Sequence, residues 1–194
     1  MVSSRGNAAN GDDVTSRPGQ SLPDRPARER VAKSIADAAA ECGISLVASL
    51  PDGWITHLIE RFAGDARFRH VAVNREESAI GLCSGAFFGG IGAFALMGAS
   101  GFLTCIYALT KINYTYQVPL LIGITMRGGF GDQAKFHQSN ALYLEPVMKA
   151  IDIPYMVIGR AADIPRLGVA YRHSRTYARP VVVGFTRDVL RGEA

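Results

Sequence analysis

The chain alternates short, uninterrupted apolar runs with segments of helical periodicity. Six apolar runs lie at 44–50, 70–73, 93–97, 118–125, 154–158 and 180–185. A strand that is apolar on both sides has to be covered on both faces, and such strands are typical of parallel sheets. Helices between consecutive strands supply that cover. The sequence therefore predicts an α/β fold, with a six-stranded, mostly parallel sheet and helices on both faces.

Helical periodicity fills the intervals between these runs. Glycines at 43 and 64 follow two of the periodic segments and are typical signals of a helix end. A glycine-rich helix is expected to begin at Glu76. The other predicted helices cover 29–41, 54–62, 102–116, 141–151 and 162–175.

Four loops are expected at the carboxyl edge of this sheet, where parallel sheets build their binding sites. Three are short, at 51–53, 74–76 and 98–101. The fourth, 126–139, is polar and longer than the usual strand-to-helix connection, which is typical of functional loops. Catalytic and binding residues are therefore expected in these four segments.

One domain accounts for most of the chain. Its 194 residues, 48% of them hydrophobic, suffice for a single core, which we expect over residues 29–190. Residues 1–28 contain three prolines and no aromatic residue, so they are expected to form a disordered tail. This tail has no apolar stretch of the kind that a secretory signal needs, and the three cysteines show no disulfide pattern. We therefore expect a cytoplasmic protein.

No charged residue occurs between Ser78 and Thr110, a length that would suffice for a membrane span. Seven glycines interrupt this stretch, so it is predicted to be a helix, a strand and a second helix buried in protein, with no membrane contact. Gly81, Gly85 and Gly89 recur at a spacing of four. This spacing permits either close approach of another backbone or tight packing within the domain.

The chain lacks the residues that several functional classes need. The net charge of +4 is dispersed and forms no basic stripe, which argues against nucleic-acid binding. The glycine motifs of dinucleotide-binding and P-loop proteins are absent from the sequence. Segment 98–101 is no GxSxG nucleophile elbow, because Phe102 stands where the last glycine belongs. The four histidines have no metal-ligand spacing, so no metal site is predicted in this chain.

Glu76 and Glu77 come directly after a predicted strand and turn, and directly before the charge-free helix. A carboxylate in that position would lie at the mouth of an apolar crevice. Two acids in the first turn of a helix also interact favourably with its dipole, by about 0.3–1 kcal/mol each. Residue spacing alone leaves both explanations open.

Several short motifs follow one another in a fixed order between residues 44 and 185. Glu76 is followed by Ala79 and then by Gly85-Ala86-Phe87. This pattern resembles the start of the glutamate helix in the pyrimidine-binding domain of thiamine diphosphate-dependent decarboxylases, and its register selects Glu76 over Glu77. Other segments resemble the phosphonopyruvate and sulfopyruvate decarboxylase branch. They are Leu50-Pro51-Asp52, Ser100-Gly101, Arg127-Gly128-Gly129-Phe130-Gly131-Asp132, His137-Gln138, Leu144-Glu145-Pro146-Val147 and Ile153-Pro154.

The chain departs from that family at three places. Arg75 stands where many relatives carry histidine, and Gly98-Ala99 stands where Gln-Asn is frequent. The family's diphosphate and magnesium motif, GDG followed by paired asparagines, is absent from the sequence. Gly131-Asp132-Gln133 has neither the third glycine nor the downstream pair.

This resemblance implies a thiamine diphosphate-binding fold and a cofactor shared between two chains. In the family, one α/β domain holds the pyrimidine ring of thiamine diphosphate and another holds its diphosphate with Mg²⁺. The present chain resembles only the pyrimidine domain, so a separately encoded beta subunit is expected to hold Mg²⁺. At least two copies of each chain are expected in the assembly. The implied reaction is decarboxylation of a small anionic 2-oxo acid similar to sulfopyruvate or phosphonopyruvate.

The resemblance also implies roles for single residues. Glu76 is expected to hydrogen-bond N1′ of the aminopyrimidine, and His137 is the second catalytic candidate. Pro51, Ser100 and Gly101 are expected to contact the cofactor beside Glu76. The substrate candidates are Asp52, Arg127, Lys135 and Gln138.

Simpler explanations of the same residues remain open. Arg127, Lys135 and His137 can hold a second anionic group by charge-assisted hydrogen bonds, or they can be solvated loop residues. Asp52 can equally cap the helix that follows it. Two other functions are also open: a thiamine diphosphate-dependent carboligase subunit, and a non-catalytic scaffold subunit of the same fold. The intact Glu76 favours an enzyme.

Overall fold

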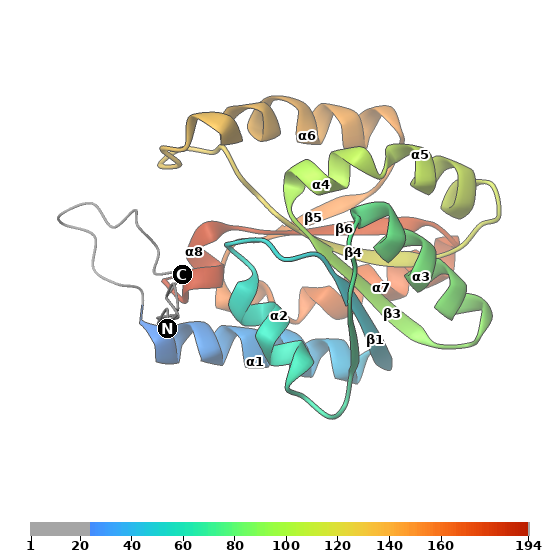
Figure 1. The fold of residues 1–194 in the computed structure, drawn as a ribbon, viewed down its shortest axis with the longest axis horizontal. Coiled ribbons are helices and arrows are strands. Elements are labelled where there is room, and N and C mark those ends of the chain that lie inside the picture. The colour runs from blue at the N-terminus through green and yellow to red at the C-terminus, as the bar shows by residue number, and fades with distance from the viewer. Residues whose placement is uncertain (1–23, 194) are drawn as a thin grey trace, which may run out of the picture.

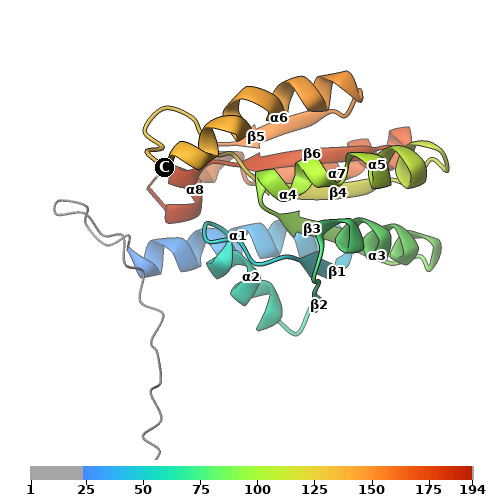
Figure 2. The ribbon, with the colours of Figure 1, turned by 45° about the horizontal axis from the view of Figure 1, so that its top comes forward.

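Parallel hydrogen bonding joins six strands into one sheet. The computed structural model describes residues 24–193, in which the strands follow the order β2-β1-β3-β4-β6-β5 (Figure 2). Every neighbouring pair is parallel. The predicted α/β fold with a six-stranded sheet is therefore confirmed, and the sheet is wholly parallel. The strands are β1 (Ile44–Ser49), β2 (Arg69–Ala72), β3 (Gly92–Met97), β4 (Leu120–Thr125), β5 (Tyr155–Ile158) and β6 (Pro180–Phe185).

Helices cover both faces of this sheet. Figure 1 shows α4, α5 and α6 on one side and α1 on the other. One core cluster, with Ile35 and Val183 among its members, lies beneath α1, α2, α7 and α8. The other, which includes Ile80 and Ile122, lies beneath α3, α4 and α6. The helices are α1 (Arg25–Glu41), α2 (Thr56–Ala63), α3 (Glu76–Phe88), α4 (Ala99–Thr104), α5 (Ile106–Ala108), α6 (Gln138–Ala150), α7 (Arg166–Tyr177) and α8 (Arg187–Arg191).

The amino-terminal helix begins earlier than its sequence pattern predicts. Helix α1 starts at Arg25 rather than Glu29, because the fixed backbone angle of Pro26 suits the first turn of a helix. Residues 1–23, most of the predicted disordered tail, lie outside the described residues. Gly43 ends α1 with a positive φ of 76°, as its position in the sequence predicts.

Two further differences concern the carboxyl edge of the sheet. The helix predicted over 102–116 begins already at Ala99, and it continues through α5 into a π-helical segment, Leu109–Tyr114. The predicted loop 126–139 ends in a 3₁₀ turn, Lys135–His137, that leads into α6. Helix α8 has no counterpart among the predicted elements, because five residues are too few to show helical periodicity.

The charge-free stretch 78–110 is divided among α3, β3 and the helices that follow, as its glycines predict. Gly90 has a positive φ of 74° and lies in the turn between α3 and β3. Across residues 24–193, no helix combines the length and the apolar character that a membrane crossing requires.

Gly92 allows the first residue of β3 to pass against the end of α1. A Cβ at position 92 would overlap the carbonyl oxygen of Gly43 and lie 2.9 Å from the hydroxyl of Tyr171. The positive φ of Gly43 fixes that carbonyl, so we expect Gly92→Ala to lower the free energy of unfolding by about 1–3 kcal/mol. Urea denaturation measures the change.

Gly81→Ala is the matched control in α3. A Cβ there meets nothing within 4 Å. Alanine is a better helix former than glycine, so this variant should be neutral or more stable by up to about 1 kcal/mol. Equal stability losses in the two variants would contradict the proposed close approach.

Candidate active site

The carboxylate of Glu76 is held over a glycine at the carboxyl edge of the sheet. Glu76 is half-buried at the first position of α3, and its side chain lies against Gly101 in α4. A Cβ at position 101 would overlap this carboxyl group. Among residues 24–193, no hydrogen bond or ion pair to the Glu76 carboxylate is found. Its neighbour Glu77 instead pairs with Arg75, with 3.3 Å between Oε1 and Nη2.

Asp52 meets Arg127 across the same edge. Nη2 of Arg127 lies 2.5 Å from Oδ1 of Asp52, and both side chains are 13% exposed. The same carboxylate oxygen accepts the backbone N–H of Trp54 at 2.9 Å, so Asp52 also orders the turn before α2. Gly98 makes room for the carboxylate, because a Cβ at that position would lie 2.5 Å from Oδ2 of Asp52. Asp52 thus both caps the turn before α2 and pairs with Arg127.

His137 continues this network from the other side of Arg127. Nη1 of Arg127 lies 2.7 Å from Nε2 of His137, and Nδ1 of His137 lies 2.7 Å from Oδ2 of Asp132. A guanidinium has no acceptor, so Nε2 accepts from Arg127 and Nδ1–H donates to Asp132. The four side chains Asp132, His137, Arg127 and Asp52 therefore form one chain of hydrogen bonds, with His137 in its neutral Nδ1–H form.

Asp132 anchors that chain in the long loop. Burial raises the pKa of its carboxyl group, but backbone N–H groups of Gly128 and Ala134 and the contact with His137 outweigh burial and hold the pKa below its usual range. The N–H of Gly128 donates to Asp132 at 2.9 Å and that of Ala134 at 3.1 Å. Gly128 has a φ of +80°, and a Cβ there would overlap the carbonyl oxygen of His137. Only glycine therefore lets the loop fold back on His137.

Trp54 is surrounded by the cationic and ring groups of this region. The guanidinium of Arg127 lies 4.9 Å from the centre of the indole ring, and that of Arg187 lies 5.7 Å from it. The ring of His137 meets the indole edge-on at 5.6 Å. Stacking of a guanidinium group on an aromatic face is favourable, so these contacts help to hold Arg127 and Arg187 against Trp54.

A cavity of about 520 Å³ opens beside Trp54, between α6 and α8. Ligand sites in proteins have volumes of this order. The walls include Trp54, Arg127, Asn140, Leu144 and Arg187. No group of three or more metal-ligating side chains occurs in the described part of the chain.

The structure brings together two groups of the predicted site residues. Glu76 and Gly101 form the first, and Asp52, Arg127 and His137 form the second. Ser100 lies beside Gly101 and donates to Oδ1 of Asn140 at 3.0 Å.

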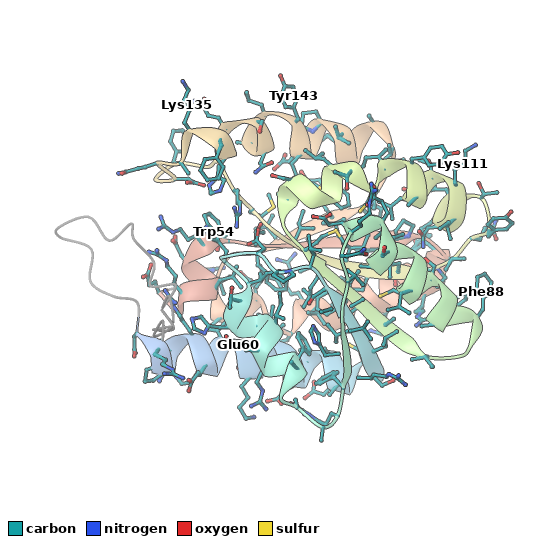
Figure 3. All side chains as sticks on the ribbon, in the orientation of Figure 1. Trp54, Glu60, Phe88, Lys111, Lys135 and Tyr143 are labelled. Atoms are coloured by element: carbon teal, nitrogen blue, oxygen red, sulfur yellow. The ribbon has the colours of Figure 1, made fainter. Side chains whose placement is uncertain are left out.

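The other three predicted residues, Pro51, Lys135 and Gln138, are exposed. Figure 3 shows Lys135 pointing away from the molecule. Their contacts with cofactor or substrate stay predictions.

Four residues of the site were not among the predicted site residues. Asp132 stands five residues before His137 in a glycine-rich loop, which is a usable sequence signal. Arg187 follows the last strand closely, where a site residue is expected in a parallel sheet. Trp54 and Asn140 gave no such signal, since Trp54 fits the apolar stripe of the helix predicted over 54–62 and Asn140 directly precedes the helix predicted over 141–151.

Comparisons with known proteins place the chain among named relatives. It is 30% identical over 129 residues to the sulfopyruvate decarboxylase subunit alpha of Methanococcus maripaludis, covering 66% of this chain and 75% of the relative. It is 27% identical to the protein of the same name from Methanocaldococcus jannaschii, covering 62% and 72%. Phosphonopyruvate decarboxylase of Streptomyces viridochromogenes is 30% identical over 47% of this chain and 23% of that protein. No family model matches the sequence.

A solved structure with the same fold is the 2-oxoglutarate:ferredoxin oxidoreductase from Magnetococcus marinus, with 2-oxoglutarate, coenzyme A and succinyl-CoA bound. The TM-score is 0.64, and the match covers 82% of this chain and 29% of that chain. The sequence identity is 13%, so this likeness concerns the fold alone.

Asp132→Asn should destabilise the chain in a pH-dependent way. The lowered pKa of Asp132 means that its ionised form stabilises the fold above the unfolded pKa of about 3.9, and that this contribution is lost as pH falls through the folded pKa. We expect a loss of about 1–3 kcal/mol at neutral pH, because buried N–H groups lose a charged acceptor. The difference between the urea midpoints of wild type and variant should be present at pH 7 and should shrink as pH falls below about 3.9. Glu60→Gln, at an exposed position of α2, is the control, and a pH-independent difference for Asp132→Asn would refute the assignment.

Proposed function

The chain belongs to the family of sulfopyruvate decarboxylase alpha subunits, and we propose that it is the pyrimidine-side subunit of a thiamine diphosphate-dependent 2-oxo acid decarboxylase. The observation that carries this proposal is the free carboxylate of Glu76, half-buried over Gly101. A scaffold subunit would have no need to keep such a group unpaired at the edge of the sheet. A cytoplasmic location, expected from the cysteine pattern, belongs to the same proposal.

The residues around Glu76 fit the pyrimidine half of the cofactor. Glycine at 101 leaves bare backbone beside the carboxylate, and no described residue competes for its oxygens. When bound, thiamine diphosphate supplies the nucleophilic carbon and the electron sink for decarboxylation. Glu76 would hold a proton at N1′ of the aminopyrimidine ring. Ser100, kept in place by Asn140, and Pro51 would border the same ring.

The substrate would approach from the side of Arg127 and His137. The ion pair with Asp52 and the contact with His137 fix the guanidinium before any ligand arrives. A preorganised cation of this kind suits a small anionic 2-oxo acid. His137 is oriented by Asp132, so its Nε2 and the guanidinium act as one unit.

The diphosphate and Mg²⁺ would be held by a separate beta subunit. Two of the relatives are named as alpha subunits, which supports a second chain. At least two copies of each chain would complete the assembly.

An apolar surface on this chain supports such a partner. We define the α3–α5 surface by the exposed side chains of Leu82, Phe88, Ile91, Tyr107 and Tyr116. Cβ atoms built on Gly81 and Gly85 meet nothing within 4 Å, so the glycine stripe of α3 is not used for packing within the domain. Exposed apolar patches mark interaction sites. This surface would lie against another chain of the assembly.

Glu76→Gln should abolish catalysis without preventing assembly. Glutamine keeps the size of the side chain but cannot share a proton with N1′, so we expect CO₂ release to fall about 100-fold or more. The assay uses the co-expressed complex with thiamine diphosphate, Mg²⁺ and 3-sulfopyruvate or 3-phosphonopyruvate. Glu77→Gln is the matched control, because the adjacent carboxylate pairs with Arg75 and should be dispensable. Near-normal activity in Glu76→Gln would rule out the mechanism.

Phe88→Lys should weaken assembly with the beta subunit. The Phe88 side chain is 70% exposed at the end of α3 and points outward in Figure 3, so the isolated chain should keep its stability. A charge buried in an apolar interface without a partner is costly. Size-exclusion chromatography with light scattering should show separated subunits. Val169→Lys, at a 51% exposed position of α7, is the control. If both variants still formed intact complexes, the α3–α5 surface would not be part of the interface.

A further inference from the structure

Three buried N–H groups without a hydrogen-bond partner belong to residues that line the 520 Å³ cavity. They are Nε of Arg127, Nδ2 of Asn140 and Nε of Arg187. The Asn140 side chain belongs to a residue that is only 1% exposed. Buried donors in native proteins are nearly always paired, and an unpaired donor costs free energy. Three of them on residues that line one cavity favour a ligand that carries several acceptor atoms.

The cavity walls carry two arginines, Arg127 and Arg187, and only Arg127 is paired with a carboxylate among residues 24–193. Arg187 is half-buried, and no ion pair joins it to a carboxylate among residues 24–193. The cavity walls also carry three acids, Asp132, Glu145 and Asp188. Asp132 is engaged by two backbone N–H groups and His137, and Glu145 is directed to Lys149 and Tyr155. Asp188 is exposed, so water screens its charge.

The topology of the sheet explains why the cavity lies there. Strand β4 leads into α6 on one face, whereas the adjacent β6 leads into α8 on the other. Loops that leave neighbouring parallel strands toward opposite faces open a crevice between them. Strands β1 and β3 form another such point, where Asp52 meets Gly98. Arg127 connects the two, because its Nη2 binds Asp52 and its side chain also lines the cavity.

Asn140 links the cavity to the cofactor side. Its Oδ1 accepts the hydroxyl of Ser100, which fixes the amide and leaves Nδ2 as an unused donor. Ser100 stands beside Gly101, the residue over which Glu76 is held. A ligand in the cavity would therefore lie along the same edge as the reacting groups.

We propose that this cavity binds the second anionic group of the 2-oxo acid, a sulfonate or phosphonate, through Arg127, Asn140 and Arg187. The inference rests on the proposed function and deepens it by naming the residues that select the substrate. A sulfonate offers three acceptor oxygens to three N–H donors, and Trp54 and Leu144 supply apolar wall for the methylene group. The methyl group of pyruvate would leave the donors unpaired, which is how a polar site rejects an analogue that lacks the matching group.

Binding of a non-reactive analogue tests the cavity without catalysis. Trp54 is the only tryptophan of the chain and lines the cavity, so its fluorescence reports binding. 3-Sulfopropionate is titrated into the full chain and into the co-expressed complex, with propionate and sulfate as comparison ligands, and calorimetry checks the affinities. We expect 3-sulfopropionate to bind at least 10-fold more tightly than either comparison ligand.

Two variants remove single donors from the cavity. Arg187→Gln removes the guanidinium, and Asn140→Asp keeps the acceptor for Ser100 but replaces the donor with a repelling oxygen. Each should weaken 3-sulfopropionate binding at least 10-fold. Arg30→Gln, an equal charge change at an exposed position of α1, should have no effect. Unchanged 3-sulfopropionate binding in the first two variants would overturn the proposal. It would also be overturned if sulfate bound as tightly as 3-sulfopropionate, or if 3-sulfopropionate bound neither the wild-type chain nor the wild-type complex.

Turnover by the complex supplies a second readout. The ratio of kcat/KM for 3-sulfopyruvate to that for pyruvate should fall at least 10-fold in Arg187→Gln and stay unchanged in Arg30→Gln. An unchanged ratio in Arg187→Gln would overturn the assignment. If the complex releases no CO₂ from any 2-oxo acid, the proposed function fails. Donor-dependent binding of 3-sulfopropionate would then still support the cavity as an organosulfonate site.

Discussion

Cover on both faces of a parallel sheet is the constraint from which the rest of this structure follows. The four inner strands, β1, β3, β4 and β6, present apolar side chains to helices on both faces, so few polar groups lie along them. Polar groups gather at the carboxyl edge, where the chain leaves the sheet. Glu76, Asp52, Arg127 and Arg187 all lie in or beside loops of that edge, although more than a hundred residues separate the first of them from the last.

Arg127 is the residue that holds this edge together. A buried guanidinium is costly unless each of its donors is used, and here Asp52 and His137 take two of them. Asp132 fixes His137, and the indole of Trp54 lies against the guanidinium. Its Nε is buried without a partner, and the Arg127 side chain lines the cavity, so the network that orders Arg127 holds it at the proposed anion site.

The same chain also carries features that a self-contained enzyme would not need. The carboxylate of Glu76 has no partner among the described residues, and the α3–α5 surface exposes Phe88 and Tyr107 to water. Both features agree with the proposed half-site, in which a second chain covers the apolar surface and completes the cofactor site. Gly81 and Gly85 contribute by keeping the outer face of α3 open.

The sequence by itself determined the strands, the α/β class and the position of Glu76, because these depend on local runs of side chains and on one helix start. It did not determine that β6 lies between β4 and β5, because strand order depends on how the helices pack after the chain has turned. That order brings Arg187 to Arg127 across sixty positions and opens the cavity between α6 and α8. Lys135 and His137 looked equally suited to an anion in the sequence. The positive φ of Gly128 folds the loop so that His137 is buried and Lys135 is left in water.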